Sequence, residues 1–200
     1  MKKLLIIPGV LLAAFVVAML TMSGEWAVSR TQVVHASATE INEVVERLNS
    51  WPEWSYWSKE QDPEASFTFS GPEGGVGSTW NWESDGELGT GTIKVVSSSV
   101  ADGLRYELDM AGMTLQGSLS YQAVDGGTEV TFASEGKSEG WMKIFSPFVD
   151  SMVGPSYESS LAGLERHMLA VGKDVDESVP AEVPAEAPTE GNPVEATSDK

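Results

Sequence analysis

Aromatic side chains are concentrated in one ten-residue segment of this chain. Residues 48–57 read LNSWPEWSYW and hold three of the seven tryptophans together with one tyrosine. Each packed aromatic side chain buries roughly 150–250 Å², so the segment must lie against a large apolar surface. Pro52 disfavours the helical conformation for the residue before it. We therefore expect a helix to end near Ser50 and the rings to lie at a bend, where they favour a pocket over a catalytic site.

The first residues read as a membrane segment. Lys2 and Lys3 precede an uncharged run over residues 4–22, which is just long enough to cross a bilayer as a helix with the lysines in the cytoplasm. We expect residues 1–24 to be a transmembrane anchor or signal segment, with the following domain on the extracytoplasmic side. Val16-x-Ala18 and Thr21-x-Ser23 are weak cleavage patterns. This favours an uncleaved anchor; cleavage would give a secreted or periplasmic protein.

The last residues differ again in composition. Residues 173–200 are rich in proline, alanine and glutamate, contain no aromatic residue, and carry eight acids against two lysines. Such a composition predicts a disordered acidic tail, and whether it has a basic partner stays open.

The whole chain has a net charge of −18. This charge argues against nucleic acid and against charge-driven docking on anionic lipid. The absence of cysteine excludes a lipoprotein, disulfides and thiolate metal sites.

The middle of the chain, residues 25–172, reads as one α+β domain. A first strand is predicted over residues 26–36, and Ser37 with Glu40 forms a capping box that starts a helix. Alternation of apolar and polar residues predicts six further strands, over residues 65–69, 78–82, 90–96, 104–110, 113–121 and 128–132. Turns are predicted at Ala111-Gly112 and at residues 125–127.

A long amphipathic helix is predicted to close the domain. Apolar residues recur at helical spacing from Trp141 to Val153, and again from Tyr157 to Val171. Pro147, Gly154 and Pro155 interrupt this pattern, either to gate entry to a cavity or only to bend the helix. This order of elements allows a curved antiparallel sheet to wrap around the terminal helix.

Several short motifs follow one another in an informative order: VHAS at 34–37, LNSWPEWSYW at 48–57, DP at 62–63, GVGS at 75–78, WNW at 80–82, GTG at 89–91, GGTEVTF at 126–132 and LAGL at 161–164. Their order resembles the polyketide cyclase/dehydrase-like group of the SRPBCC, or START-like, superfamily. The resemblance implies a helix-grip fold around a cavity for a lipid or another hydrophobic small molecule. It does not imply a reaction, because one fold hosts many functions.

Aromatic and methionine side chains are the candidates for lining such a cavity, although a curled sheet also needs large side chains to fill its core. The predicted ligand-binding residues are Trp57, Trp80, Trp82, Tyr106, Met110, Phe145 and Phe148. Trp57 is the one that we place nearest a cavity mouth.

No catalytic arrangement stands out in the sequence. His35 and His167 are the only histidines, and neither has a partner nearby in the sequence, so we interpret both as surface or boundary residues. Arg105, Glu107 and Asp109 share the strand face opposite the apolar residues and should face solvent. Residues 71–77 are rich in glycine but lead into a strand and lack a phosphate-binding ending. We predict no catalytic residue, no metal and no cofactor.

Three hypotheses for function follow. The leading one is a non-enzymatic module, membrane-tethered or exported, that holds a hydrophobic small molecule or lipid in an internal cavity. The second is a cyclase or dehydratase type of enzyme with a hydrophobic substrate, for which His35, Arg105 and Tyr106 would be the residues to test. The third is an interaction domain at the envelope surface, with the anchor and the acidic tail as its working parts.

Overall fold

The computed structural model describes residues 15–17, 21–110 and 113–178. Most of the uncharged run over residues 4–22, the predicted turn at Ala111-Gly112 and the tail from residue 179 onward lie outside these residues. Within the described part of the chain, no helix combines the length and the apolar character needed to cross a bilayer. The predicted anchor therefore remains a prediction.

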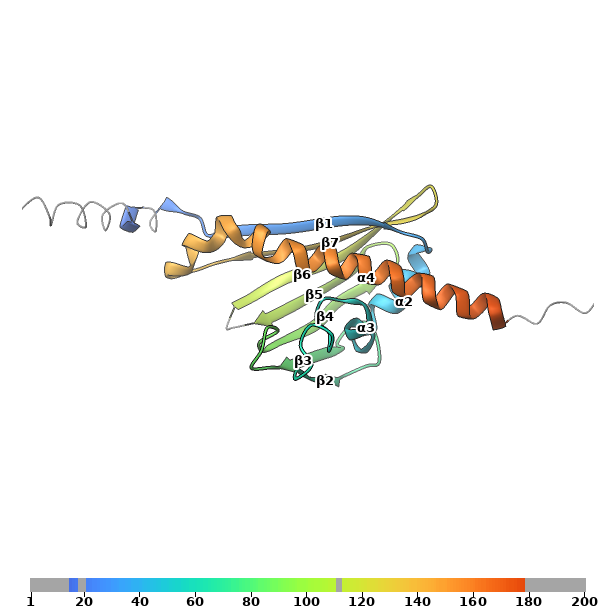
Figure 1. Ribbon diagram of the computed structural model, residues 1–200. Coiled ribbons are helices and arrows are strands. Elements are labelled where there is room, and N and C mark those ends of the chain that lie inside the picture. The colour runs from blue at the N-terminus through green and yellow to red at the C-terminus, as the bar shows by residue number, and fades with distance from the viewer. Residues whose placement is uncertain (1–14, 18–20, 111–112, 179–200) are drawn as a thin grey trace, which may run out of the picture.

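One antiparallel sheet of seven strands forms the body of the domain (Figure 1). Its strands are β1 (Glu25–Val34), β2 (Ser66–Ser70), β3 (Thr79–Glu83), β4 (Gly91–Ser99), β5 (Gly103–Met110), β6 (Met113–Val124) and β7 (Gly127–Lys137). Their order in the sheet is β1-β7-β6-β5-β4-β3-β2. The chain thus forms a meander from β2 to β7, and β1 adds to its end. All seven strands were predicted from alternation, with shifts of a few residues at their ends.

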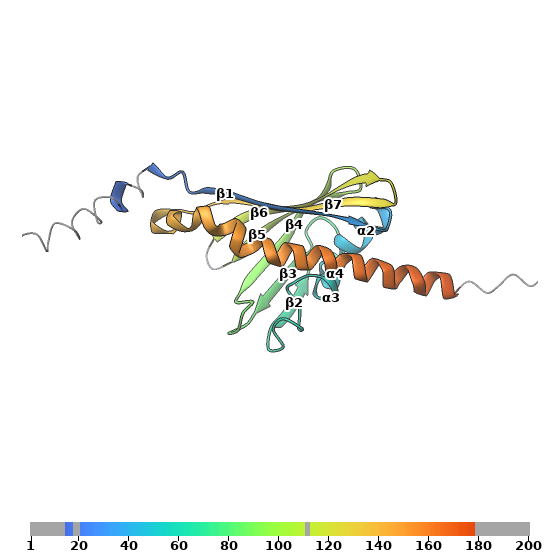
Figure 2. The same ribbon diagram turned by 45° about the horizontal axis from the view of Figure 1, so that its top comes forward.

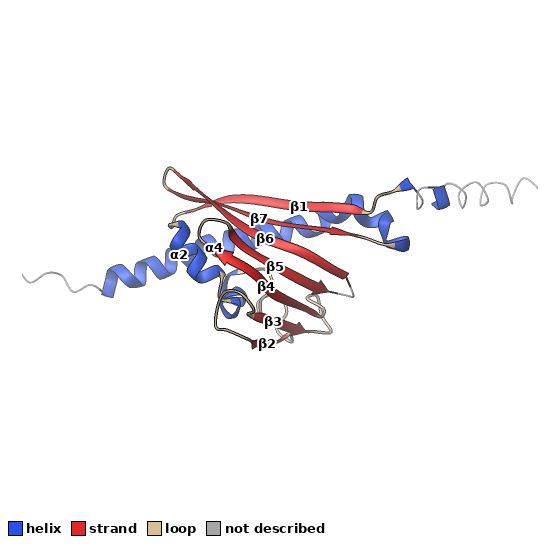
Figure 3. Ribbon diagram, turned by 180° about the vertical axis from the view of Figure 1, so that it is seen from behind, coloured by secondary structure: helices blue, strands red, loops and turns tan. Residues whose placement is uncertain are grey.

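The helices lie together on one face of this sheet, as Figure 3 shows from behind. The capping box at Ser37 is confirmed, because the Ser37 hydroxyl accepts from the Glu40 backbone N–H and the Glu40 carboxylate accepts from the Ser37 N–H. It starts α2 (Ala38–Val45), which is followed by the 3₁₀ turn η1 (Leu48–Ser50) and by α3 (Trp51–Trp54).

The expectation that Pro52 forces Trp51 out of the helical region is wrong. Trp51 has φ −57° and ψ −38°, which is helical, and Pro52 lies in the first turn of α3. A proline is tolerated there because the first N–H groups of a helix have no partner within the helix. The helix before the aromatic segment ends at Val45, five residues earlier than expected.

The final helical segment consists of two parts. The 3₁₀ helix η2 (Gly140–Phe148) contains Pro147, and α4 (Val149–Ser178) continues through Pro155 without a break. The prediction of an interruption at Pro155 is therefore wrong: this proline is the seventh residue of α4, where it removes one backbone N–H donor, and the helix continues on both sides of it. Figure 2 shows α4 running across the sheet face that also carries α2 and α3. It reaches Ser178, beyond Lys173, where we expected the tail to begin.

Two salt bridges link α4 to β1. Arg30 donates to the carboxylates of Asp150 and Glu158, with N to O distances of 2.7 Å to each. These two acids lie eight residues apart on α4, and Gly154 lies midway between them. A Cβ atom at Gly154 would collide with the Arg30 guanidinium. The glycine thus lets the arginine side chain pass close beneath the helix.

The core lies between the sheet and the helices. Trp51 is fully buried at the centre of this core. The Trp51 ring contacts the rings of Trp54, Tyr106 and Phe132 at centroid distances of 5.1, 5.5 and 6.2 Å. Its indole N–H donates to the Val45 carbonyl at 2.7 Å, so this buried polar atom is satisfied. The aromatic segment is therefore the junction where the short helices pack against the sheet.

Candidate functional site

A cavity of about 300 Å³ lies between the sheet and the first turns of α4. Its wall comes from β1, the segment after α3, the loop between β3 and β4, the strands β5, β6 and β7, and α4. The lining residues are Trp26, Tyr56, Trp57, Glu87, Leu88, Leu108, Met110, Leu115, Ser134, Met152, Val153, Pro155, Ser156 and Tyr157. We define the cavity mouth as the exposed members of this wall, which are Glu87, Met152 and Pro155.

The wall is apolar except at a few points. The clearest polar feature is the pair formed by Tyr157 and Ser134, in which the tyrosine hydroxyl donates to the serine oxygen at 2.7 Å. The Tyr157 ring stacks on Phe132 with a centroid distance of 4.1 Å, which fixes its orientation. Burial raises the pKa of Tyr157 above its usual value, so its hydroxyl stays protonated. The Ser134 hydroxyl can then donate its own hydrogen to a ligand.

Backbone contacts hold the aromatic part of the wall against α4. The Tyr56 N–H donates to the Ser160 hydroxyl at 2.9 Å, and the Trp57 ring lies 6.3 Å from that of Tyr157. This places the residues that follow the aromatic segment directly beside the polar pair.

The opposite part of the wall is a loop that Asp62 holds in place. The Asp62 carboxylate accepts from the Ser84 hydroxyl at 2.6 Å and from the Leu88 N–H at 3.3 Å. The Ser84 hydrogen bond is the main reason why the pKa of Asp62 lies below its usual value. Glu87 in this loop accepts from the Gln61 side chain. The loop thus presents Leu88 inward and a carboxylate at the mouth.

The seven predicted ligand-binding residues are divided among three places. Trp57 and Met110 lie on the cavity wall. Trp80, Trp82 and Tyr106 are almost fully buried in the core and are not part of this wall. Phe145 and Phe148 are exposed on η2, with 41% and 57% of their surface accessible. Ligand contact stays a prediction for all seven.

Several wall residues were not singled out from the sequence, although some carried a signal. Leu108 was placed on the apolar face of its strand, and Tyr157 and Met152 were placed on the apolar stripe of the last helix. Ser134 and Trp26 had no such signal. Their position on the wall depends on how β1 and β7 pair, through the register that sets Val28 opposite Ser134 and Trp26 opposite Gly136.

Both histidines lie away from the cavity. His35 is largely exposed, and its ring Nδ1 lies 2.6 Å from a carboxylate oxygen of Glu165. His167 lies 3.7 Å from the Glu53 carboxylate. The expectation that they are surface or boundary residues is confirmed. Arg105, Glu107 and Asp109 are exposed on the outer face of β5, which confirms the solvated interpretation of that strand.

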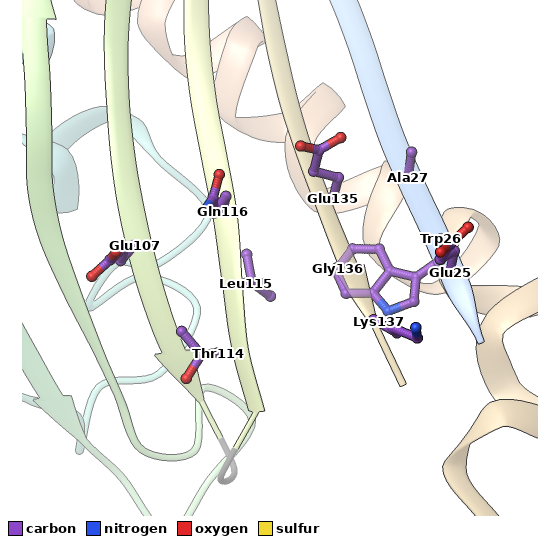
Figure 4. Close-up of a pocket in the computed structure, with 10 residues that line it drawn as sticks. All are labelled: Glu25, Trp26, Ala27, Glu107, Thr114, Leu115, Gln116, Glu135, Gly136 and Lys137. Atoms are coloured by element: carbon purple, nitrogen blue, oxygen red, sulfur yellow. The ribbon is translucent and has the colours of Figure 1, made fainter. Parts of the chain in front are cut away.

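A second hollow, of about 720 Å³, lies on the outer face of the sheet. It forms where β6 and β7 separate, because their pairing begins at Gln116 and Glu135 and leaves residues 113–115 of β6 without a partner in β7. Figure 4 shows Leu115 on one side of this space and Trp26 with Gly136 on the other. Trp26 and Leu115 line both the outer hollow and the inner cavity. These two side chains therefore separate the cavity from the outer face.

The described residues contain no group of three or more histidine, aspartate or glutamate side chains arranged to hold a metal ion. The wall supplies no histidine, lysine or arginine. Its chemistry is that of an apolar container with one neutral hydroxyl pair inside and one carboxylate at its mouth.

Comparisons with known proteins agree with this fold. The family model described as polyketide cyclase / dehydrase and lipid transport matches residues 25–169. No curated protein matches the chain significantly. Among solved structures, truncated norcoclaurine synthase from Thalictrum flavum has a TM-score of 0.56 at 16% identity, covering 72% of this chain and 94% of that one.

Two further structures show the same fold. Ara h 8.0201 has a TM-score of 0.56 at 15% identity, with 74% of this chain and 99% of that chain covered. The KanY protein has a TM-score of 0.55 at 13% identity, with coverage of 72% and 97%. At these identities the likeness concerns the fold alone, and it supports the predicted helix-grip arrangement of a curved sheet and a long terminal helix.

Proposed function

This chain belongs to the polyketide cyclase/dehydrase and lipid transport family, the SRPBCC group that its motifs resemble, and from that premise we propose that it binds a hydrophobic small molecule in the cavity between the sheet and α4. Family membership supports a hydrophobic ligand. The observation that carries the proposal is the cavity itself, whose wall is apolar apart from the Tyr157–Ser134 pair, Ser156 and Glu87. Such a wall binds apolar groups and orients them through few polar contacts.

The size of the cavity narrows the ligand class. Its volume of about 300 Å³ lies at the lower end of the range of about 300–1,000 Å³ that is usual for small-molecule pockets. This suits a medium-length acyl chain or one fused-ring system, with a carbonyl or hydroxyl group placed at Ser134.

We also propose that residues 1–24 attach the domain to a membrane on its extracytoplasmic side. The support is the uncharged run over residues 4–22 after two lysines. The ligand-binding proposal does not depend on this attachment, since the cavity is built from residues 26–157.

Binding rather than catalysis is the function that the wall favours. General acid–base chemistry needs a titratable group within hydrogen-bond reach of the reacting atoms. The wall offers Glu87 at the mouth, where it is exposed, and Tyr157, whose pKa burial raises. The raised pKa of Tyr157 keeps its hydroxyl protonated near neutral pH, so this residue is a poor general base.

Native mass spectrometry of the full chain with decanoic acid tests the proposal. We expect a one-to-one complex for the wild type. Val153→Trp should abolish it, because this half-buried wall residue would fill the cavity, whereas Val149→Trp, one turn earlier on α4 and outside the wall, should retain it. If both variants kept the complex, or if the wild type formed none, the proposal would be overturned. A bound species of altered mass would instead indicate an enzyme.

A further inference from the structure

Four large apolar side chains are exposed together near the start of the final helical segment. Trp141, Phe145, Phe148 and Met152 have 65%, 41%, 57% and 68% of their surface accessible. We call them the aromatic patch. Trp141 and Phe145 are in edge-to-face contact at a centroid distance of 5.9 Å, so the patch is contiguous there. Exposed apolar clusters of this kind mark interaction sites.

The patch is almost free of charge in a strongly acidic chain. Residues 140–149 contain no acid and one base, Lys143, while the whole chain carries a net charge of −18. Of the acids that flank this range, Glu139 is exposed just before η2 and Asp150 is paired with Arg30 of β1. A partner for this surface must therefore be apolar, with little charge of its own.

The chain enters the domain beside the patch. The Gly24 carbonyl accepts from the Ser138 N–H at 2.9 Å and from the Ser146 hydroxyl of η2 at 3.0 Å. Figures 1 and 2 show the start of β1 next to η2 and the first turns of α4. The uncharged run ends at Met22, and two residues of chain span at most about 7 Å. A membrane that holds this run up to Met22 therefore lies within that distance of Gly24, which contacts η2.

We propose that the aromatic patch inserts into the lipid–water boundary of the membrane to which residues 1–24 attach the domain. The partner is the uncharged lipid surface. Aromatic rings prefer this boundary, and interfacial helices bury their apolar face about 5–10 Å deep there, which matches the reach of the chain from Met22. This inference rests on the membrane attachment proposed above.

The docked orientation places the Met152 edge of the cavity mouth at the bilayer. Met152 belongs to both the patch and the mouth, and the next residue, Val153, lines the cavity. A single acyl chain can therefore pass from the bilayer into the cavity along this part of α4. The membrane is then the source of the ligand.

Single-cysteine labelling tests the docking, since the chain has no cysteine of its own. The full chain is reconstituted into phosphatidylcholine vesicles with a nitroxide at Phe145→Cys or Phe148→Cys. Phe69→Cys is the matched control, because Phe69 is 39% exposed on β2 at the far edge of the sheet. We expect labels at 145 and 148 to favour collisions with oxygen over a water-soluble nickel chelate by on the order of tenfold relative to position 69.

Equal ratios at all three positions would overturn the inference. Dipolar broadening between labels at 148 in vesicles would show that a second copy covers the patch, and immobilised labels in detergent would show that the N-terminal segment covers it; both results count against lipid contact. Decanoic acid binding is measured separately, in detergent, on the same variants. A label that enters the lipid in a chain that binds no decanoic acid leaves the docking intact and refutes the cavity function.

Discussion

Three strand glycines determine how closely the aromatic rings approach the sheet. A Cβ atom at Gly91, Gly117 or Gly136 would collide with the rings of Trp82, Tyr106 and Trp26, respectively. Each glycine therefore lets a ring of the neighbouring strand lie flat across its backbone. This accommodates three large rings within a curved sheet, and it sets the position of Trp26 at the edge of the cavity.

Gly163 illustrates the same effect on α4. In the interior of an ordinary helix, alanine stabilises the helix relative to glycine by about 1 kcal/mol. A Cβ atom at position 163, however, would collide with the Trp54 carbonyl at the end of α3. We expect Gly163→Ala to lower the free energy of unfolding by about 1–3 kcal/mol, measured by urea denaturation of the detergent-solubilised chain.

The comparison variant for this prediction is Ala170→Gly, at an exposed position of the same helix. It should cost about 1 kcal/mol through helix propensity alone. A Gly163→Ala variant as stable as the wild type, or more so, would show that α3 and α4 are not in close contact at this point.

Asp62 should give the domain part of its acid sensitivity. Its pKa in the folded chain is lowered below the ordinary value of 3.8, so folding favours the ionised form. The contribution of Asp62 to stability is therefore complete above the pKa that it has in the unfolded chain, and it is lost as the pH falls through the pKa that it has in the folded chain. We expect Asp62→Asn to lower the melting temperature equally at pH 7 and pH 5, with the difference shrinking below about pH 4.

Asp85→Asn is the matched control, since Asp85 is exposed in the loop that Asp62 holds. It should leave the melting temperature unchanged throughout this range. If Asp62→Asn lowered stability by the same amount at pH 2 as at pH 7, the effect would be one of packing rather than of charge.

At the level of elements, local patterns predicted the strands well because each strand buries one face. On β5, Leu104, Tyr106 and Leu108 are buried while Arg105 and Glu107 are exposed, as alternation indicates. The 3₁₀ form of η2 and the continuity of α4 through Pro155 were not predictable in this way. This region is tied to the start of β1 by long-range contacts that local patterns do not contain, since Ser146 of η2 donates to the Gly24 carbonyl and Asp150 of α4 pairs with Arg30 of β1.

Trp26 and Leu115 lie between the cavity and the outer hollow where β6 separates from β7, so loss of one of these side chains should join the two and create a second route into the cavity. We expect Trp26→Ala to open this route and to speed the release of a bound fluorescent fatty acid by about tenfold, equivalent to ~1.4 kcal/mol of barrier. Stopped-flow dilution of the loaded chain into acceptor vesicles measures this rate.

Phe69→Ala is the control, because it removes a partly exposed ring from β2 at the edge of the sheet opposite β1. Its release rate should match that of the wild type. Unchanged release from Trp26→Ala would indicate that ligands exchange solely through the mouth at Met152.

For the whole molecule, the candidate site was predictable as a kind of site but not as a set of residues. The sequence indicated a cavity under a curved sheet, yet Trp80, Trp82 and Tyr106 fill the core, while Trp26 and Ser134 line the cavity. Side chains on the inner face of the sheet line the cavity only where no side chain from the helices packs against them; elsewhere they form the core. That depends on how α4 crosses the sheet, a long-range property that local patterns do not contain.

We expect the long helix to make the domain one cooperative unit, and chain termination tests this. Beyond Tyr157, α4 buries Leu161, Leu164 and Met168 against the core. Burying each such side chain is worth about 1.5–3 kcal/mol, so the three together contribute on the order of the 5–15 kcal/mol that stabilises a typical domain.

A chain that ends after Tyr157 should therefore fail to unfold cooperatively in thermal denaturation followed by circular dichroism. A chain that ends after Ser178 keeps all three residues and should retain both the wild-type melting temperature and decanoic acid binding. A cooperative transition in the shorter chain would show that the sheet and the aromatic segment fold without the part of α4 that follows Tyr157.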